Sequence, residues 1–170
     1  MSRLAFTPGH HSFYGCAHIT IISGKVTVLG AELETGFSTD LFAPISGIPT
    51  EFFSESGFGM EFVPIPESVL TTDEIRLYYV RSCPDGFNQI APCFFHSPVV
   101  RGAAFPESVV RFLDKLASGE PLKLFFGGPR GAGKSTLCRF AANRILNKHD
   151  SVVVVDLDIG QSGLSLPGTI

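Results

Sequence analysis

The sequence predicts an α/β protein, in which an amino-terminal all-β, sandwich-like domain precedes the opening βαβ unit of a parallel sheet. Short runs of β-branched and aromatic residues recur between glycine, proline and serine through the first hundred residues, which is typical of strands. Further along, a helical pattern is followed by two short apolar runs on either side of a second helical pattern. We therefore expect a β-rich domain over residues 1–98, a linker and helix over 99–120, and the βαβ unit over 121–170.

The clearest strand pattern is a hairpin near the start of the chain. Residues 17–22 and 25–29 alternate in period two across Ser23-Gly24, which suits a short turn. Three further runs are bounded by turn residues and are expected to be strands: 60–63, 75–81 and 89–95. Such strands form a small sandwich or barrel.

A linker and a helix follow the β domain. Residues 99–106 predict a linker that ends in a helix-start signal. Four apolar residues then fall on one face of a helix, which Gly119 ends: Val109, Phe112, Leu113 and Leu116.

The βαβ unit begins with residues 122–126, a short apolar run that suits a strand buried on both sides. A helix is predicted from Lys134 to about Asn147, and residues 152–155 predict a second buried strand. Strands joined through a helix in this way open the parallel sheet of a P-loop NTPase domain.

The loop before the second helix matches a phosphate-binding motif. Residues 128–135 read Gly-Pro-Arg-Gly-Ala-Gly-Lys-Ser, which fits the P-loop pattern GxxxxGK[ST] in full and lies between a predicted strand and a predicted helix. That context disfavours the alternative, a glycine-rich turn. The motif predicts binding of an ATP- or GTP-like nucleotide with Mg²⁺ by these residues: Gly128, Pro129, Arg130, Gly131, Ala132, Gly133, Lys134, Ser135 and Thr136.

Each position of the loop has a physical reason. Backbone N–H groups converge on the β-phosphate at the positive end of the helix dipole, and a side chain at Gly131 or Gly133 would obstruct that wrapping. Lys134 is expected to neutralise the β- and γ-phosphates. Ser135 is expected to bind Mg²⁺, and Thr136 to donate to the α-phosphate.

The second buried strand delivers two carboxylates at its carboxyl end, where the ligands of parallel sheets gather. If the strand continues, Asp156 and Asp158 point the same way, so that one holds the water shell of the metal while the other faces the nucleophile. The alternative is that both carboxylates cap a turn.

Charge is distributed unevenly along the chain. Residues 1–100 hold four Lys or Arg against ten Asp or Glu, whereas residues 121–149 hold six basic residues and no acidic one. The basic residues are Lys123, Arg130, Lys134, Arg139, Arg144 and Lys148. The positive field therefore surrounds the predicted phosphate site.

Composition excludes several classes of protein. No apolar run approaches the roughly 20 residues that span a bilayer, and Pro8 interrupts the amino terminus before a signal core develops, so we expect no membrane segment and no secretory route. The four cysteines lack zinc or redox spacing, so we expect reduced thiols. Apart from the adjacent pair His10-His11, the five histidines show no metal spacing, so we expect surface or core roles.

A segment near the end of the chain carries a family resemblance. Residues 156–161 read Asp-Leu-Asp-Ile-Gly-Gln, and residues 166–170 read Leu-Pro-Gly-Thr-Ile. Placed after a P-loop, a helix and a strand, they resemble the polynucleotide 5′-hydroxyl kinase family of RNA-processing proteins, in which a β domain also precedes the P-loop domain. Residues 14–30 are more similar to its nucleolar pre-rRNA branch and residues 165–170 to its pre-mRNA cleavage-factor branch; we slightly favour the nucleolar one.

The resemblance implies transfer of the γ-phosphoryl group of ATP to the 5′-hydroxyl of an RNA or DNA end. It implies that Lys134 and Ser135 hold the nucleotide and Mg²⁺, that Asp158 is the base for the 5′-hydroxyl, and that Asp156 is its metal-organising neighbour. Gln161 would contact a nucleic-acid phosphate or the metal's water. The resemblance also implies protein partners in an RNA-processing complex and a nuclear or nucleolar location.

The chains of that family continue beyond the position of Ile170 with an arginine-bearing lid, an aromatic clasp and a further domain. We therefore expect that this sequence alone is not an active kinase, and we favour truncation of a longer kinase over a natural short paralogue. Two other functions stay open: a nucleotide-binding scaffold subunit with little or no kinase activity, and an unrelated P-loop ATPase.

Overall fold

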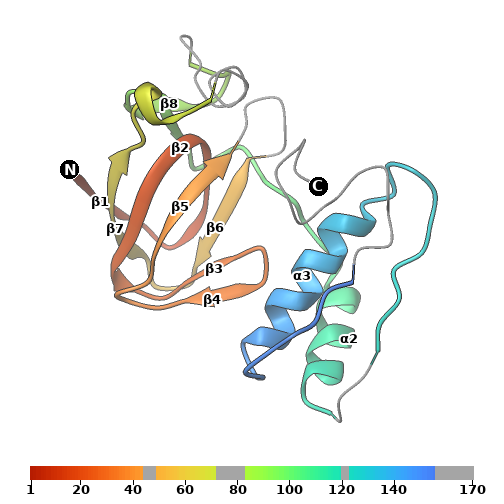
Figure 1. The fold of residues 1–170 in the computed structure, drawn as a ribbon. Helices are drawn as coiled ribbons and strands as arrows, with labels where there is room; N and C mark the ends of the chain where they lie inside the picture. Colours follow the sequence, from red (N-terminus) through yellow and green to blue (C-terminus); the bar gives the residue numbers. More distant parts are fainter. Residues whose placement is uncertain (44–48, 72–82, 120–122, 156–170) are drawn as a thin grey trace. The chain divides into compact units, whose positions relative to one another are not determined.

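The computed structural model describes residues 1–43, 49–71, 83–119 and 123–155. The chain divides into two compact units, unit 1 over Met1–Phe105 and unit 2 over Pro106–Ile170 (Figure 1). The strand predicted over 75–81 and the candidate site residues Asp156, Asp158 and Gln161 lie outside the described residues.

Unit 1 is an antiparallel β domain, as the sequence predicts. Its described strands are β1 (Ser2–Phe6), β2 (Gly9–Gly24), β3 (Val26–Val28), β4 (Ala31–Leu33), β5 (Ser38–Ala43), β6 (Thr50–Ser54), β7 (Phe58–Pro64), β8 (Asn88–Ala91) and β9 (Phe94–Ser97). A turn of 3-10 helix, η1 (Glu67–Val69), follows β7. Every pairing between the described strands is antiparallel.

The long strand β2 belongs to two layers. Its first half pairs with β6 and β9, and its second half pairs with β5 and β7. The strand crosses from one layer to the other near Gly15, whose φ of +104° falls in the left-handed region. A Cβ atom at this position would lie 1.8 Å from the carbonyl oxygen of Cys93, so the close approach of β9 requires glycine.

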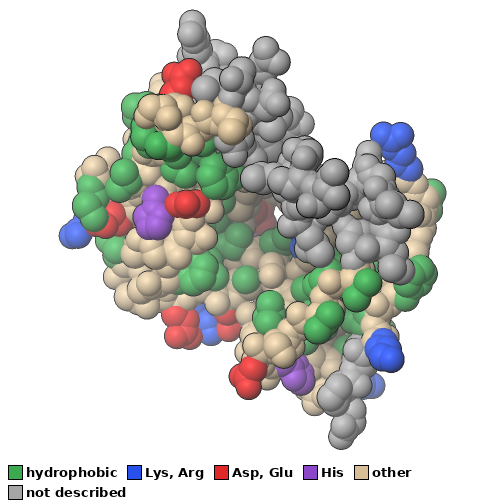
Figure 2. All heavy atoms as spheres, viewed as in Figure 1, with side chains coloured by type: hydrophobic (Ala, Val, Ile, Leu, Met, Phe, Trp, Pro, Cys, Tyr) green, Lys and Arg blue, Asp and Glu red, His purple; other side chains and the backbone are tan. Residues whose placement is uncertain are grey.

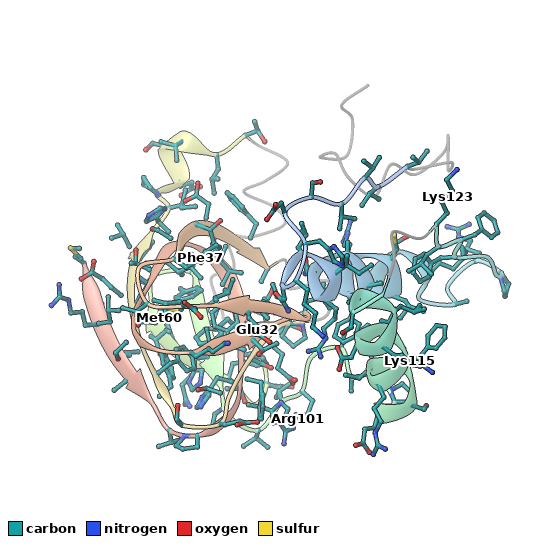
Figure 3. All side chains as sticks on the ribbon, turned by 90° about the horizontal axis from the view of Figure 1, so that it is seen from below. Glu32, Phe37, Met60, Arg101, Lys115 and Lys123 are labelled. Carbon is teal, nitrogen blue, oxygen red and sulfur yellow. The ribbon has the colours of Figure 1, made fainter. Side chains whose placement is uncertain are left out.

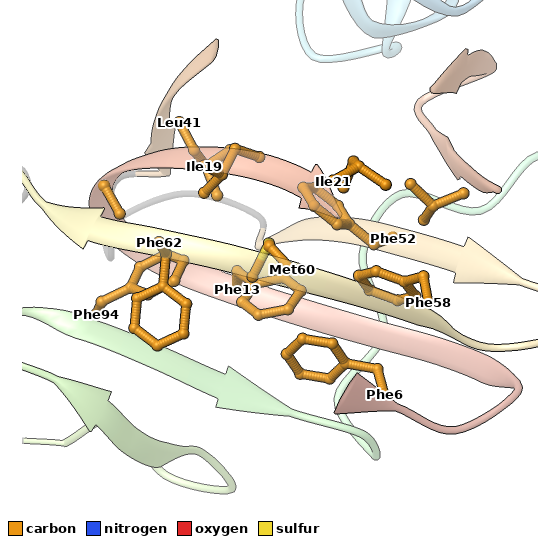
Figure 4. Close-up of a cluster of buried hydrophobic side chains, with 12 residues drawn as sticks. Phe6, Phe13, Ile19, Ile21, Leu41, Phe52, Phe58, Met60, Phe62 and Phe94 are labelled. Atoms are coloured by element: carbon orange, nitrogen blue, oxygen red, sulfur yellow. The ribbon is translucent and has the colours of Figure 1, made fainter. Parts of the chain in front are cut away.

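The core of unit 1 lies between the two layers and is rich in phenylalanine (Figure 4). The ring of Phe13 on β2 lies 5.0 Å from that of Phe52 on β6 and 5.6 Å from that of Phe94 on β9. Phe62 on β7 contacts Phe94 at 5.3 Å, and Met60 also points inward (Figures 3 and 4). Burial of these side chains, each worth about 1.5–3 kcal/mol, stabilises the domain.

The predicted hairpin across Ser23-Gly24 is wrong. Strands β2 and β3 are consecutive but do not pair; β3 pairs instead with β4 and with β6. The turn of the real hairpin lies at Leu29-Gly30, where both residues have positive φ, the geometry that matches the twist of a tight hairpin. Period-two alternation identified strand residues correctly, but it carries no information about which strands pair.

The single strand predicted over 89–95 is two strands, β8 and β9, which form a hairpin. The chain reverses between Ala91 and Phe94, and Cys93 there has a φ of +53°. The turn follows from Pro92, which cannot donate to a sheet ladder.

Unit 2 contains two described helices, α2 (Glu107–Ala117) and α3 (Lys134–Leu146), both predicted from the sequence. Pro106 precedes α2, consistent with the preference of proline for helix starts. Leu113 and Ala117 of α2 and Phe140 and Ala141 of α3 are buried, and the two helices are in contact. Phe112, however, is 59% exposed, because the buried face of α2 is centred on Leu113 and Ala117 rather than on the predicted face that includes Phe112.

Residues 123–126 and 152–155 are not assigned to strands, in contrast to the prediction. Both segments alternate between exposed and half-buried residues, and Phe125, Val153 and Val155 are 83%, 87% and 71% exposed. A strand buried on both faces needs hydrogen-bonding neighbours and covering helices, which the described residues of unit 2 do not supply. Hydrophobic side chains consequently gather on the surface around α2 and α3 (Figure 2).

None of the helices in the described part of the chain is both long enough and apolar enough to cross a membrane.

Candidate nucleotide-binding site

The predicted P-loop is the direct connection into α3. Residues 128–133 are all exposed, and α3 starts at Lys134. Gly131 and Gly133 have φ values of +77° and +78°, which side chains other than glycine adopt only at a cost. Apart from the adjoining residues, no described part of the chain comes within 4 Å of a Cβ built at either position, so the requirement for glycine seen here is conformational rather than steric.

Lys134 is folded back onto its own loop. Its Nζ donates a hydrogen bond to the carbonyl oxygen of Pro129 at 2.8 Å, and the backbone N–H of Ala132 donates to the same oxygen at 3.3 Å. These two bonds hold residues 129–134 in a compact ring. The ammonium group therefore lies over the loop, where an anion cradled by the loop amides would meet it.

The amino terminus of α3 is electropositive. The first helical hydrogen bond runs from Leu137 N–H to the carbonyl of Gly133 at 2.9 Å, so the amides before Leu137 have no carbonyl within the helix. Among the described residues no side chain caps this end, and no acidic residue lies in the first turn. The site thus offers N–H donors and helix-dipole charge to an anion.

Contacts between the two helices fix the far end of α3. The guanidinium of Arg144 donates to Asp114 Oδ1 through Nε at 2.8 Å and also through a second nitrogen. Lys148 Nζ donates to Ser118 Oγ at 2.7 Å, and His149 Nε2 lies 2.8 Å from the carbonyl oxygen of Ala117. The carboxyl ends of α2 and α3 are therefore tied together, which orients the helix that carries the loop.

The structure brings together one of the two predicted groups of site residues. The nine residues 128–136 are the exposed loop 128–133 and the first three residues of α3, of which Ser135 is exposed and Lys134 and Thr136 are half-buried. The second group, Asp156, Asp158 and Gln161, belongs to the part of the chain that is not described. Their arrangement around the loop stays a prediction.

A polar cluster on unit 1 escaped the sequence analysis. His18 Nδ1 lies 2.7 Å from Asp40 Oδ1, and its Nε2 lies 2.8 Å from Ser38 Oγ, on neighbouring strands β2 and β5. Ser38 also bonds to Thr20 Oγ1 at 2.8 Å, so the four residues form a hydrogen-bonded ladder on the exposed side of the sheet. The four residues come together because of the register in which β5 pairs with β2. Residues 17–22 alone do not determine that register.

Within the described ranges no group of three or more His, Cys, Asp or Glu side chains could hold a metal ion.

Comparison with known proteins gives a consistent answer for the second part of the chain. Residues 128–170 match the family model described as the P-loop of mRNA cleavage and polyadenylation factor CLP1. A polyribonucleotide 5′-hydroxyl-kinase of Thermococcus kodakarensis, TK1956, is 42% identical over 66 residues, which are 38% of this chain and 19% of the relative. The P-loop region of the chain is thus similar to the CLP1/NOL9 polynucleotide 5′-hydroxyl kinase family.

Other proteins with CLP1 or NOL9 names match stretches of comparable length. A CLP1 homologue of Aedes aegypti is 49% identical over 43 residues, covering 25% of this chain and 10% of the relative. The polynucleotide 5′-hydroxyl-kinase NOL9 of Drosophila melanogaster is 39% identical over 57 residues, covering 34% of this chain and 6% of the relative. The matches thus span less than a fifth of each relative and include both named branches of the family.

Solved structures of Clp1p bound to Pcf11p also resemble the chain. One is 15% identical, with a TM-score of 0.42 over 84% of this chain and 28% of the other. A second, which concerns the extended Pcf11p–Clp1p interface and ATP loss in a point mutant, is 14% identical, with a TM-score of 0.45 over 86% of this chain and 30% of the other.

Proposed function

We propose that this chain is the nucleotide-binding part of an ATP-dependent polynucleotide 5′-hydroxyl kinase that acts in RNA processing. The observation that carries the proposal is the P-loop at the start of α3, which lies within the stretch that matches the CLP1 P-loop family. Relatives that match part of the chain are polyribonucleotide and polynucleotide 5′-hydroxyl kinases. The acceptor is then the 5′-hydroxyl of an RNA or DNA end.

In this proposal the loop residues 128–136 bind ATP. The free amides at the start of α3 hold the β-phosphate, and Lys134 exchanges its bond to the Pro129 carbonyl for the β- and γ-phosphates. The exchange replaces a neutral acceptor with an anionic one, which makes a stronger hydrogen bond. Thr136 donates to the α-phosphate.

The residues also fit Mg²⁺, which prefers oxygen ligands and keeps part of its water shell. The hydroxyl of Ser135 is exposed in the first turn of α3, and Asp156 would supply a carboxylate from the end of the following segment. Bound Mg²⁺ neutralises charge on the phosphates. We propose that residues 122–126 and 152–155 become the first parallel strands of a complete P-loop domain, which would bring Asp156 to this edge.

The remaining two site residues would serve the acceptor. Asp158 takes the proton from the 5′-hydroxyl while the hydroxyl oxygen forms a bond to the γ-phosphorus. The bond from that phosphorus to the β–γ bridging oxygen breaks, and ADP leaves. Gln161 contacts a phosphate of the acceptor strand. As an RNA-processing kinase the protein would work in the nucleus or nucleolus, in a complex with other proteins.

The first test separates nucleotide binding from transfer. ATP binding to the chain is measured by calorimetry with Mg²⁺, and transfer is measured with γ-labelled ATP and a 5′-hydroxyl RNA oligonucleotide. Lys134→Ala is expected to weaken ATP binding about ten- to a hundredfold, because it removes a charged hydrogen bond. Lys115→Ala is the matched control, since it removes an exposed lysine of α2.

The two readouts distinguish the candidate functions. Label on the RNA that Lys134→Ala abolishes would support the kinase. ATP binding without transfer, also in a longer form of the protein, would favour the nucleotide-binding scaffold. Equal ATP affinity in the wild type, Lys134→Ala and Lys115→Ala would refute the P-loop assignment.

A further inference from the structure

The chain that leaves β9 is attached to the sheet of unit 1 over residues 98–102, which we call the strap. At its start, the Oγ of Ser97 accepts a hydrogen bond from the backbone N–H of Val100 at 3.1 Å. At its end, the N–H of Gly102 donates to Glu51 Oε2 on β6 at 2.8 Å. This part of the chain, most of which was predicted to be a linker, is therefore held at both ends.

The two anchors of the strap belong to one row of side chains across the sheet. Ser97 of β9 and Glu51 of β6 are both register partners of Ser12 on β2. Two strand spacings, about 10 Å, separate the outer members of such a row, and the five residues of the strap are long enough to cross them. Ser12, in the middle of the row, is completely buried, as expected for a residue beneath such a strap.

Both oxygens of the Glu51 carboxylate have partners. His10 Nδ1 donates to Oε1 at 2.8 Å, since an ionised carboxylate can only accept, while Oε2 takes the Gly102 N–H. The Glu51 side chain is only 16% exposed, so both bonds are largely shielded from water. A hydrogen bond to an ionised acceptor is about twice as strong as one between neutral groups. Glu51 is thus a fixed and strong acceptor for the end of the strap.

The fit of the strap on β6 also depends on shape. A Cβ atom at Gly102 would lie 2.7 Å from Glu51 Cβ and 2.9 Å from the carbonyl oxygen of Pro49, closer than non-bonded atoms of these kinds approach. The backbone of Gly102 therefore lies directly against the chain at 49–51. A side chain at this position would push the strap away even with Glu51 in place.

We propose that Glu51 is a latch that holds the strap on unit 1, so that any movement between the two units pivots beyond Gly102. The inference does not depend on the proposed kinase function. With the latch open, the pivot moves back to Ser97. The connection to α2, which starts at Glu107, then gains five residues, or about 17 Å of extended chain.

NMR relaxation of backbone amides tests the proposal on the full chain. The order parameters of Arg101 and Gly102 are expected to be about 0.85 in the wild type and to fall below about 0.6 in Glu51→Ala. Glu51→Gln, which keeps a neutral acceptor, should give intermediate values. The matched control is Glu34→Ala, since Glu34 is an exposed carboxylate of unit 1 that lies 3.9 Å from Lys25 and should leave the strap unchanged.

Cleavage by trypsin after Arg101, which is exposed (Figure 3), gives a second measurement. Loss of a hydrogen bond to a charged group should speed this cleavage about tenfold or more in Glu51→Ala. Circular dichroism checks that the variants are folded. If Glu51→Ala does not fold, Glu51→Gln and Gly102→Ala carry the test, because Gly102→Ala displaces the strap by collision and leaves the Glu51 carboxylate intact.

Three results would overturn the proposal. One is an order parameter for Gly102 that is already below about 0.6 in the wild type. Another is unchanged order and unchanged cleavage in folded Glu51→Ala. The third is release of the strap by Gly102→Ala but by neither Glu51 variant, because the strap would then be held by shape alone.

Discussion

The two units of the molecule differ in how far the apolar side chains of their extended segments are buried. In unit 1 Phe13 is fully buried among rings from three other strands, whereas in unit 2 Phe125 is 83% exposed on a segment that pairs with no strand in the described part of the unit. Both residues lie in runs with strong strand character. The difference shows that a strand sequence becomes a strand only where neighbours supply hydrogen bonds on its edges and cover on its faces.

In unit 1 the chain at Cys93 and Phe94 passes very close to Gly15 of β2. A substitution at Gly15 should therefore destabilise the unit strongly. We expect Gly15→Ala to lower the free energy of unfolding by about 3–5 kcal/mol, because the new Cβ meets the Cys93 carbonyl and the backbone keeps a left-handed φ. Urea denaturation measures the change. Gly36→Ala, at a φ of +96° but in open space, should cost only about 1–2 kcal/mol. Equal losses would show that the approach of β9 imposes no steric demand.

A pair of phenylalanine substitutions tests the comparison directly. Phe13→Ala should destabilise the chain by about 3–4 kcal/mol through a cavity in the core, whereas Phe125→Ala should change stability by less than about 0.5 kcal/mol. Thermal unfolding followed by circular dichroism compares the two. A large loss for Phe125→Ala would mean that residues 123–127 are covered in solution.

Acid should weaken unit 1. Burial, together with the neighbouring His11, lowers the pKa of His96 from 6.5 to about 4. The unfolded chain therefore binds this proton first as the pH falls, so stability holds above pH 6.5 and declines between pH 6.5 and about 4. We expect a loss of about 2 kcal/mol, less than the full shift because the ring is partly accessible to solvent.

The control for this pH effect is His96→Gln, which removes the titrating ring. Denaturation midpoints of the variant and the wild type are measured over the same pH range. If the variant loses stability as steeply as the wild type, another group is responsible for the acid sensitivity.

Polar contacts join the two helices of unit 2. Each of these contacts should contribute less to the free energy of unfolding than a buried phenylalanine of unit 1. Asp114→Asn is expected to cost about 1 kcal/mol, since the pair with Arg144 is half-buried and two guanidinium nitrogens donate to the carboxylate. A double-mutant cycle with Arg144→Gln isolates the coupling, and Glu107→Gln on the exposed pair with Arg111 should cost only about 0.3–0.5 kcal/mol. A coupling energy near zero for Asp114 and Arg144 would contradict this account of the helix pair.

The features that depend on neighbouring residues in the sequence, above all the two helices, were predicted correctly. The helix predicted from Lys134 to about Asn147 is observed as Lys134–Leu146. It begins directly after a glycine of the P-loop motif, which marks its start in the sequence. The helix beginning after Pro106 was predicted from another local signal, a helix start followed by apolar residues at helical spacing. The loop predicted to bind phosphate is equally local: its motif lies in consecutive residues, and the structure shows these residues as the connection into α3, while their role in binding stays a prediction.

Non-local pairing explains what the sequence could not predict. The partners of β2 come from four strands spread between Ser38 and Ser97, and alternation within residues 17–22 specifies a face rather than a partner. The ladder of Asp40, His18 and Ser38 was missed for the same reason. Residues 123–126 and 152–155 have the composition of buried strands, but composition does not supply the neighbours that a parallel sheet requires.

The sharing of β2 between layers sets the order in which the protein can fold during translation. Ser12 and Phe13 on β2 pair with Ser97 and His96 on β9, and the side-chain contact between His11 and His96 joins positions 85 residues apart. A ribosome that has released β2 must therefore add most of unit 1 before this strand meets its last partner. Contacts of such high sequence separation form slowly and leave strand edges exposed meanwhile. The nascent chain thus has a period in which part of the edge of β2 is still unpaired.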